Sequence, residues 1–166
     1  MLCAVLSLVL TATSYGQSQT FTDSSVEYTF DLPNTTWKMT VKPSEISPNV
    51  EYVFGDRMNG HLEVRKLTVK QNDLMGEVVA GEEEKLKFLQ GYVAGKEENF
   101  AGNLRGNIFN YEYVRSGRNM SGRFYFLRAN PTTVYILRFT GLRDKLLAVR
   151  NQIDLIARTF EIRKAS

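Results

Sequence analysis

Residues 104–140 read LRGNIFNYEYVRSGRNMSGRFYFLRANPTTVYILRFT, and this stretch decides the fold. Apolar and aromatic side chains alternate with polar ones in three runs, which are Leu104–Val114, Ser121–Arg128 and Thr133–Thr140. A period of two residues is typical of β-strands with one buried face. Residues 116–119 and 129–132 separate the runs and have the composition of turns. We therefore predict a three-stranded antiparallel meander.

The register of this meander follows by counting if each turn has four residues. On the face turned away from the core, Glu112 then lies opposite Arg123, and Arg123 lies opposite Arg138. Tyr125 belongs to the adjacent row of the same face. The core face holds two rows, formed by Tyr111, Phe124 and Leu137 and by Phe109, Phe126 and Tyr135.

Two arginines that lie opposite each other repel, so this arrangement needs counter-charges. One interpretation is that Arg123 and Arg138, with Glu112 and Tyr125 beside them, form a binding site for a carboxylate or a phosphate. The alternative is that a helix covers this face and supplies a second acidic side chain, such as one from Glu82–Glu84. A one-residue bulge would shift the register and move these side chains to the opposite face, so that the predicted group of residues would not form.

Period-two patterns also predict strands upstream of the meander. They cover Val26–Leu32, Thr36–Val41, Val50–Phe54 and His61–Val69, and the last two form a hairpin around residues 55–60. We expect His61 to be exposed, because it follows a glycine in that turn. Trp37 lies beside a strand, where a single tryptophan usually anchors the core.

Helical spacing of apolar residues predicts two helices. Asp73 can cap the first helix, and Val78 and Val79 fit its spacing, but Gly76 and Gly81 weaken these first turns. The prediction therefore rests on Glu82–Ala94, whose first turn holds Glu82–Glu84, where the helix dipole favours carboxylates. The second covers Leu142–Phe160 and has the clearest apolar stripe of the chain. Its members are Leu142, Leu146, Val149, Ile153, Ile156 and Phe160.

The N-terminal residues indicate export. Leu2–Ala12 is an apolar run too short to span a bilayer, and Ser14-Tyr15-Gly16 has small side chains where a signal peptidase cleaves. No basic residue precedes the run, and a buried N-terminal element is the alternative. We expect a signal peptide over residues 1–16, a single domain over residues 17–166, and a periplasmic or extracellular location.

Removal of the signal takes away Cys3, which is the only cysteine. The remaining chain then has neither disulfides nor cysteine-based metal or nucleophile chemistry. His61 is the only histidine, so a multi-histidine metal site is excluded. We expect no cofactor and no metal. Nucleic acid is not an expected partner, because an exported chain without an aromatic and basic reading motif lacks the usual features of such proteins.

The charges divide the chain into two halves. Residues 17–102 contain 9 Lys and Arg against 14 Asp and Glu, a net charge of −5. Residues 103–166 contain 12 against 4, a net charge of +8. The basic half can present a surface for an anionic partner or membrane. Alternatively, the two halves interleave in one domain and their charges pair.

The sequence resembles the family of the PsbP extrinsic protein of photosystem II. The similar features are Tyr28–Pro33 leading into Trp37, then Arg123-Phe124-Tyr125, Val134–Leu137 and the closing Arg158–Ile162. The resemblance implies an α+β fold, in which helices flank both faces of a central antiparallel sheet in an α/β/α sandwich. It also implies an accessory role, because the family includes lumenal or periplasmic accessory proteins, lipoproteins and a nuclear import factor that binds a small GTPase.

Three functions follow as hypotheses. The first is a non-catalytic exported module that docks on an unknown protein partner in an envelope or membrane complex. The second is a carrier of a small molecule or lipid, with a pocket lined by arginine and by a tyrosine-rich wall of the sheet, formed by Tyr111, Tyr113, Tyr125 and Tyr135. An internal cavity of roughly 300 Å³ or more would favour it. The third is a hydrolase whose carboxylates act without histidine, which would require buried carboxyl groups with raised pKa values in a cleft.

Overall fold

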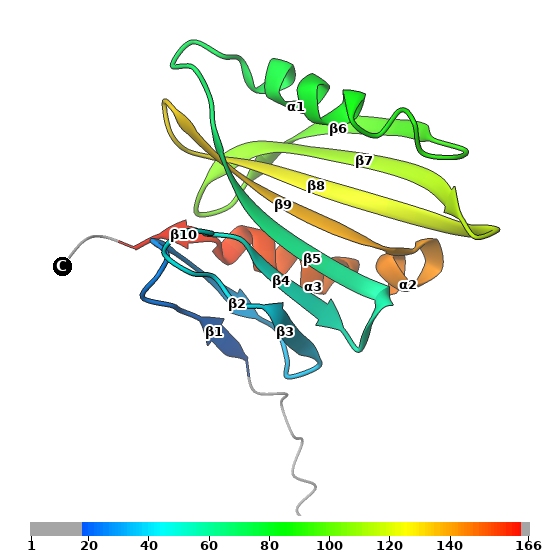
Figure 1. Cartoon of the computed structure of the whole chain (residues 1–166), viewed down its shortest axis with the longest axis horizontal. Coiled ribbons are helices and arrows are strands. Elements are labelled where there is room, and N and C mark those ends of the chain that lie inside the picture. Colours follow the sequence, from blue (N-terminus) through cyan, green and yellow to red (C-terminus); the bar gives the residue numbers. More distant parts are fainter. Residues whose placement is uncertain (1–17, 164–166) are drawn as a thin grey trace, which may run out of the picture.

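The computed structural model of the protein describes residues 18–163 and contains two antiparallel sheets (Figure 1). The large sheet has seven strands in the order β3-β4-β5-β9-β8-β7-β6, and the small sheet has the order β1-β2-β10. The strands are β1 (Gln19–Phe21), β2 (Tyr28–Leu32), β3 (Trp37–Val41), β4 (Val50–Phe54), β5 (Asp56–Thr68), β6 (Val93–Ala101), β7 (Arg105–Arg115), β8 (Arg118–Asn130), β9 (Thr133–Leu142) and β10 (Glu161–Ile162). The signal peptide expected over residues 1–16, with Cys3, lies outside the described residues.

The predicted meander is confirmed as β7, β8 and β9, but the predicted register is wrong. The turn between β7 and β8 has two residues and not four, because Arg115 pairs with Arg118. Ser116 and Gly117 have φ values of 51° and 70°, and two successive positive φ angles make a turn that continues the twist of a hairpin. The pairing therefore moves by two residues, which keeps every side chain on its predicted face.

The register between β8 and β9 differs by one residue, and this changes a face. Asn130 pairs with Thr133 across a two-residue turn, and the pairing then shifts between Arg128 and Asn130. Beyond this irregularity Arg123 lies opposite Phe139, and Arg138 lies opposite Phe124. Because side chains alternate along a strand, the shift puts Arg138 on the opposite face from Arg123.

The first helix forms in the upstream part of the predicted segment, which Gly76 and Gly81 were expected to weaken, and the prediction of a helix over Glu82–Ala94 is wrong. Helix α1 covers Met75–Glu84, and residues 85–92 form turns that lead into strand β6. The acidic residues Glu82–Glu84 therefore end the helix, so the predicted favourable contact with the helix dipole is wrong. Strand β6 was not predicted, because its side chains are exposed except for Phe100 and show no apolar alternation.

The C-terminal helix divides into α2 (Arg143–Ala148) and α3 (Arg150–Thr159), separated at Val149 with φ −103° and ψ 12°. Its predicted apolar stripe is confirmed: apart from Leu142, every member is buried. Among residues 18–163, no helix is both long enough and apolar enough to cross a bilayer.

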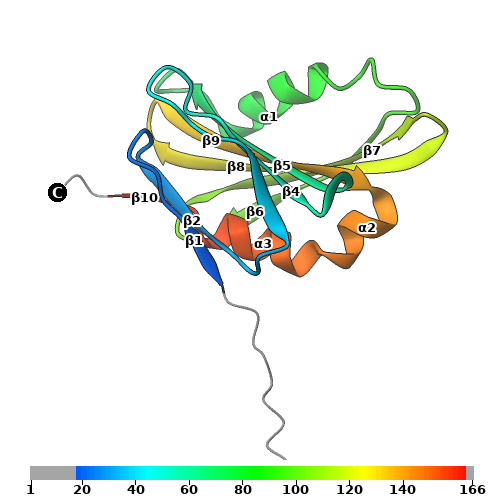
Figure 2. The ribbon, with the colours of Figure 1, turned by 60° about the horizontal axis from the view of Figure 1, so that its bottom comes forward.

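Two apolar clusters lie on the two faces of the large sheet. On one face, Val78 and Val79 of α1 pack with residues such as Phe124 and Ile136. On the other, α3 and the small sheet pack together against the large sheet, and Figure 2 shows α1 and α3 on opposite sides. The α+β class and the central antiparallel sheet are confirmed. The expected helical layers are met only in part, since α1 buries just three side chains and the small sheet shares the second face.

Trp37 is buried in the cluster on the α3 face, as predicted for a core anchor. Its indole Nε1 donates a hydrogen bond of 3.1 Å to Oε1 of Gln152 on α3. Strand β3 is an edge of the large sheet, so this bond joins the edge strand to the C-terminal helix.

Candidate functional site

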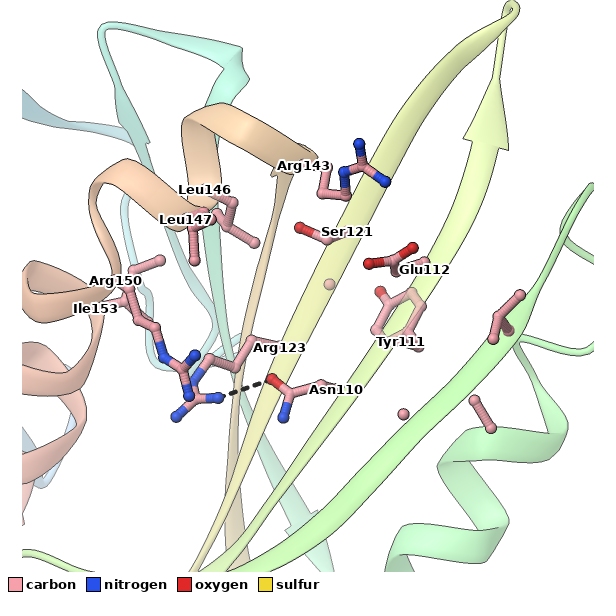
Figure 3. Close-up of a pocket in the computed structure, with 14 residues that line it drawn as sticks. Asn110, Tyr111, Glu112, Ser121, Arg123, Arg143, Leu146, Leu147, Arg150 and Ile153 are labelled. Atoms are coloured by element: carbon pink, nitrogen blue, oxygen red, sulfur yellow. Dashed lines mark hydrogen bonds between the residues drawn. The ribbon is translucent and has the colours of Figure 1, made fainter.

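A cleft of about 540 Å³ lies where the helices α2 and α3 meet the strands β6, β7 and β8 (Figure 3). The helices contribute Arg143, Leu146, Leu147, Arg150 and Ile153. The strands contribute Val93–Gly95 from β6, Asn110–Glu112 from β7 and Ser121–Arg123 from β8. The cleft therefore has apolar walls and carries three arginines against one carboxylate.

Arg123 lies at the floor of the cleft and is only 6% exposed. Its Nε donates a 2.6 Å hydrogen bond to Tyr125 Oη, and its Nη1 donates one of 2.7 Å to Asn110 Oδ1. Its Nη2 lies 3.1 Å from Asp154 Oδ1, on α3, and forms an ion pair with it. The guanidinium is thus fixed in place, and its charge is balanced by a carboxylate.

The hydroxyl of Tyr125 links Arg123 to Asp154. Its hydroxyl accepts the hydrogen bond from Arg123 Nε and donates one to Asp154 Oδ1. Burial, together with the hydrogen bond to Asp154, raises the pKa of the Tyr125 hydroxyl well above its ordinary value of 10. The hydroxyl therefore stays protonated near neutral pH and keeps its bond to the carboxylate.

The rim of the cleft is cationic and partly apolar. Arg150 forms no ion pair within the described part of the chain, and Arg143 has only its neighbour Asp144, at 3.5 Å. The side chains of Leu147 and Val93 are 64% and 60% exposed beside them. Glu112 is also exposed at this rim. An anionic group with an apolar neighbour would find complementary partners here.

The predicted fork of Arg123 and Arg138 is not formed, because Arg138 lies on the α1 face. There its Nε donates a 3.0 Å hydrogen bond to Tyr111 Oη. Its guanidinium carbon lies 5.9 Å from the centre of the Tyr111 ring and 5.5 Å from that of Phe124. Glu112 lies opposite Ser121 and not opposite Arg123. Of the four candidate ligand-binding residues, the cleft brings together Arg123 and Glu112, with Tyr125 directly behind Arg123.

The expected tyrosine-rich wall is divided between the two faces. Tyr111 and Tyr113 belong to the cluster on the α1 face, whereas Tyr125 and Tyr135 belong to the cluster on the α3 face. Among the four, Tyr111 alone lines the cleft. A helix does cover Arg123, as the alternative interpretation expected, but the acidic group comes from α3 as Asp154 and not from Glu82–Glu84.

The charges of the two halves do not pair with each other. Eleven ion pairs connect the described residues; nine join residues before position 103, two join residues after it, and none joins the halves. In the basic half, Arg123 and Arg143 are paired, each with an acid of that half. The alternative that the halves neutralise one another is therefore wrong for residues 18–163.

His61 and Glu82 could support catalysis or metal binding, but both lie outside the cleft and form ion pairs with neighbouring side chains. His61 is half-buried and lies 2.8 Å from Glu51, so the expectation that it is exposed is wrong. Glu82 is buried beside Arg65 and Lys85. Burial alone would raise the pKa of Glu82, but hydrogen bonds from Lys85 and Arg65 outweigh it and lower the pKa. Within residues 18–163, no three side chains of the types that bind metals are grouped to hold an ion.

Sequence reasoning missed the helical wall of the cleft, although a signal was present. Arg143, Leu147 and Arg150 are spaced by four and three residues, so they follow one another along one side of a helix. Leu147 lies outside the apolar stripe, and an exposed leucine between two arginines indicates a surface that can accept a ligand. The residues of β6 gave no such signal, because the strand itself was not predicted.

No family model and no curated protein matches the sequence. Solved structures do match. Mog1p, the Ran-binding protein of Saccharomyces cerevisiae, shares 13% identity over 89% of this chain and 96% of its own, with a TM-score of 0.61. The cyanobacterial PsbP of Synechocystis sp. PCC 6803 shares 12% identity over 91% of this chain and 95% of its own, with a TM-score of 0.56. The chain has the PsbP-like fold.

A third solved structure has the same fold. LpqN of Mycobacterium tuberculosis, which is involved in cell envelope biogenesis, shares 16% identity over 89% of this chain and 91% of its own, with a TM-score of 0.57. The family resemblance read from the sequence is thus confirmed at the level of the fold. At these identities the likeness concerns the arrangement of the chain and not its residues.

Proposed function

We propose that the protein is an exported, non-catalytic binding module that docks on a protein of the cell envelope or of a membrane-associated complex. The observation that carries the proposal is the basic half, whose cations are not neutralised by the acidic half. A surface on which arginines outnumber carboxylates attracts an acidic partner and orients it. The fold that the chain shares with LpqN and with the Ran-binding Mog1p supports a binding or accessory role.

The docking surface in this proposal is the rim of the cleft. Arg143 and Arg150 supply the charge, and Leu147 and Val93 supply exposed apolar area next to it. Arginine is frequent where proteins bind one another, since it combines charge with a flat guanidinium. We expect the partner to present an acidic segment with an apolar anchor. The same basic half can also contact an anionic membrane surface.

A photo-crosslinking residue at position 147, introduced in cells of the source organism, tests the docking. We expect one partner protein to be crosslinked, with the attachment in an acidic segment. The matched control places the crosslinker at Leu155, which is exposed on α3 but does not line the cleft. The double change Arg143→Glu and Arg150→Glu should abolish the crosslink, whereas Lys145→Glu with Arg158→Glu, of equal charge, should leave it intact.

A second candidate function is that of a carrier, and the volume of the cleft favours it. A cleft of about 540 Å³ is within the range of pockets that hold small molecules. Native mass spectrometry of the protein purified from its source distinguishes the two functions. A bound metabolite, with no protein crosslinked at position 147, would contradict docking and support the carrier.

Export is part of the proposal and has its own test. We propose that residues 1–16 are removed and that Gln17 becomes the first residue of the mature protein. N-terminal sequencing of the protein from the source organism should therefore begin at Gln17. A mature chain that retains Cys3 would contradict this cleavage.

A further inference from the structure

We propose a second binding site, for a phosphate monoester group, at the end of the β7–β8 hairpin that is remote from its turn. A cleft of about 490 Å³ lies there, separate from the one beside α2 and α3. Arg105 and Arg128 line it together with Met75 and Asn107. This proposal is independent of the docking function proposed above.

Arg105 and Arg128 lie directly opposite each other in the ladder of β7 and β8. Like charges in this position repel, and the repulsion falls when an anion binds between them. Within residues 18–163, neither arginine has a carboxylate at ion-pair distance. The sequence predicted a pair of opposed arginines, and the structure provides one here, at residues different from Arg123 and Arg138.

Arg128 is held in place by neutral groups. Its Nη1 donates a hydrogen bond of 3.1 Å to the carbonyl oxygen of Pro131, and its Nη2 donates one of 2.9 Å to that of Asp73. These carbonyls fix the plane of the guanidinium without cancelling its charge. A guanidinium that is already oriented loses less conformational entropy when a ligand binds.

The same hairpin contains an internal control for this argument. At the turn, Arg115 and Arg118 also lie opposite each other, and both are exposed. They line neither of the two clefts described here. An opposed pair alone therefore does not define the site; the cleft and the fixed guanidinium of Arg128 distinguish it.

A phosphate monoester fits these groups better than a single carboxylate does. It carries nearly two negative charges and three acceptor oxygens, and arginine binds such groups through paired N–H donors. Met75 offers an apolar contact to the group that carries the phosphate. Glu97 lies nearby, where its carboxylate accepts a hydrogen bond from Asn107, a residue that lines the cleft. That negative charge should weaken the binding of an anion.

Isothermal titration calorimetry of the full chain with phenyl phosphate tests the site. We expect Arg105→Ala and Arg128→Ala each to weaken binding by about tenfold or more, as expected for the loss of charged hydrogen bonds. The matched variants Arg115→Ala and Arg118→Ala should bind as the unchanged protein does. Glu97→Gln should bind more tightly. Arg105 is exposed, so Arg105→Ala keeps the test valid if Arg128→Ala fails to fold.

Vesicles identify the source of the phosphate. Phosphatidylcholine vesicles with and without phosphatidic acid are compared in a flotation assay with the same variants. Binding that requires phosphatidic acid and Arg105 indicates a lipid headgroup, and binding of phenyl phosphate without the vesicles indicates a soluble ligand. The proposal is overturned if neither probe binds, or if Arg115→Ala weakens binding as much as Arg105→Ala. Crosslinking at position 147 is unaffected in either case.

Discussion

Arg123 and Arg138 stand on adjacent strands of one sheet, yet the two faces hold them by different means. On the α3 face, Arg123 is buried and paired with the carboxylate of Asp154. On the α1 face, Arg138 lies over the rings of Tyr111 and Phe124 and has no carboxylate at ion-pair distance within residues 18–163. The difference follows from exposure: a fully buried charge requires a counter-charge, whereas a half-exposed one keeps its hydration and uses aromatic surface.

The comparison predicts that the α3 face is the more sensitive to the loss of a single group. Asp154→Ala leaves Arg123 buried without a counter-charge and removes the acceptor of the Tyr125 hydroxyl. We expect a loss of about 3 kcal/mol or more in the free energy of unfolding. Urea denaturation followed by circular dichroism measures it. Asp144→Ala, at an exposed carboxylate, is the control, and a similar small loss in both variants would break the comparison.

The packing of the α1 face should be sensitive to an added methyl group at Gly122. A methyl group at Gly122 would lie 2.0 Å from the Tyr111 ring, which packs with Phe124 and Tyr113 and contacts Arg138. We expect Gly122→Ala to lower the free energy of unfolding by about 1–3 kcal/mol, because the buried ring has no room to move. Gly76→Ala is the control, since an added methyl there meets no atom within 4 Å. Equal stability of the two variants would contradict the packing described.

Removal of the aromatic contact itself should have a smaller effect. Arg138→Met keeps much of the apolar stem and loses both the cation–π contacts and the hydrogen bond to Tyr111. We expect a loss of about 1 kcal/mol. A double-mutant cycle with Phe124→Leu isolates the contact to that ring. A coupling energy near zero would show that the ring does not stabilise the guanidinium.

Acid should lower the free energy of unfolding by a limited amount, because it protonates Glu27 on the α3 face. Burial would raise the pKa of this carboxyl, but hydrogen bonds from Lys66 and Tyr135 outweigh it and lower the pKa from 4.5 to about 2. A lowered folded-state pKa stabilises the protein above pH 4.5, and this contribution is lost as the pH falls towards 2. Glu27→Gln should therefore flatten the decline of stability over this range. An unchanged pH profile in urea titrations would contradict the assignment.

Much of the fold could be predicted because it follows from repetition along the chain. The alternation over residues 104–140 and the apolar stripe from Leu146 to Phe160 each depend on many residues, so no single error removes them. Strand β6 could not be predicted, since Val93–Ala101 is an edge strand whose side chains, apart from Phe100, are exposed to water. Its position is set by backbone pairing with β7, which leaves no mark on hydrophobic spacing.

The candidate site was harder to predict because it depended on two turns. A two-residue turn at Ser116-Gly117 and the shift between Arg128 and Asn130 together decide which arginines meet. Turn length depends on backbone angles at single residues, and one residue of shift exchanges the faces of a strand. The sequence therefore predicted the types of residue at the site, but it could not predict their partners.

Trp37 gives the molecule a single optical probe at a useful place. It is the only tryptophan in the chain, and its indole hydrogen bond to Gln152 joins the edge strand β3 to α3. Its emission should therefore shift to longer wavelength when α3 separates from the sheet, even if the rest of the sheet persists. Fluorescence and circular dichroism, recorded on the same sample, would then show whether the C-terminal helix leaves before the strands unfold.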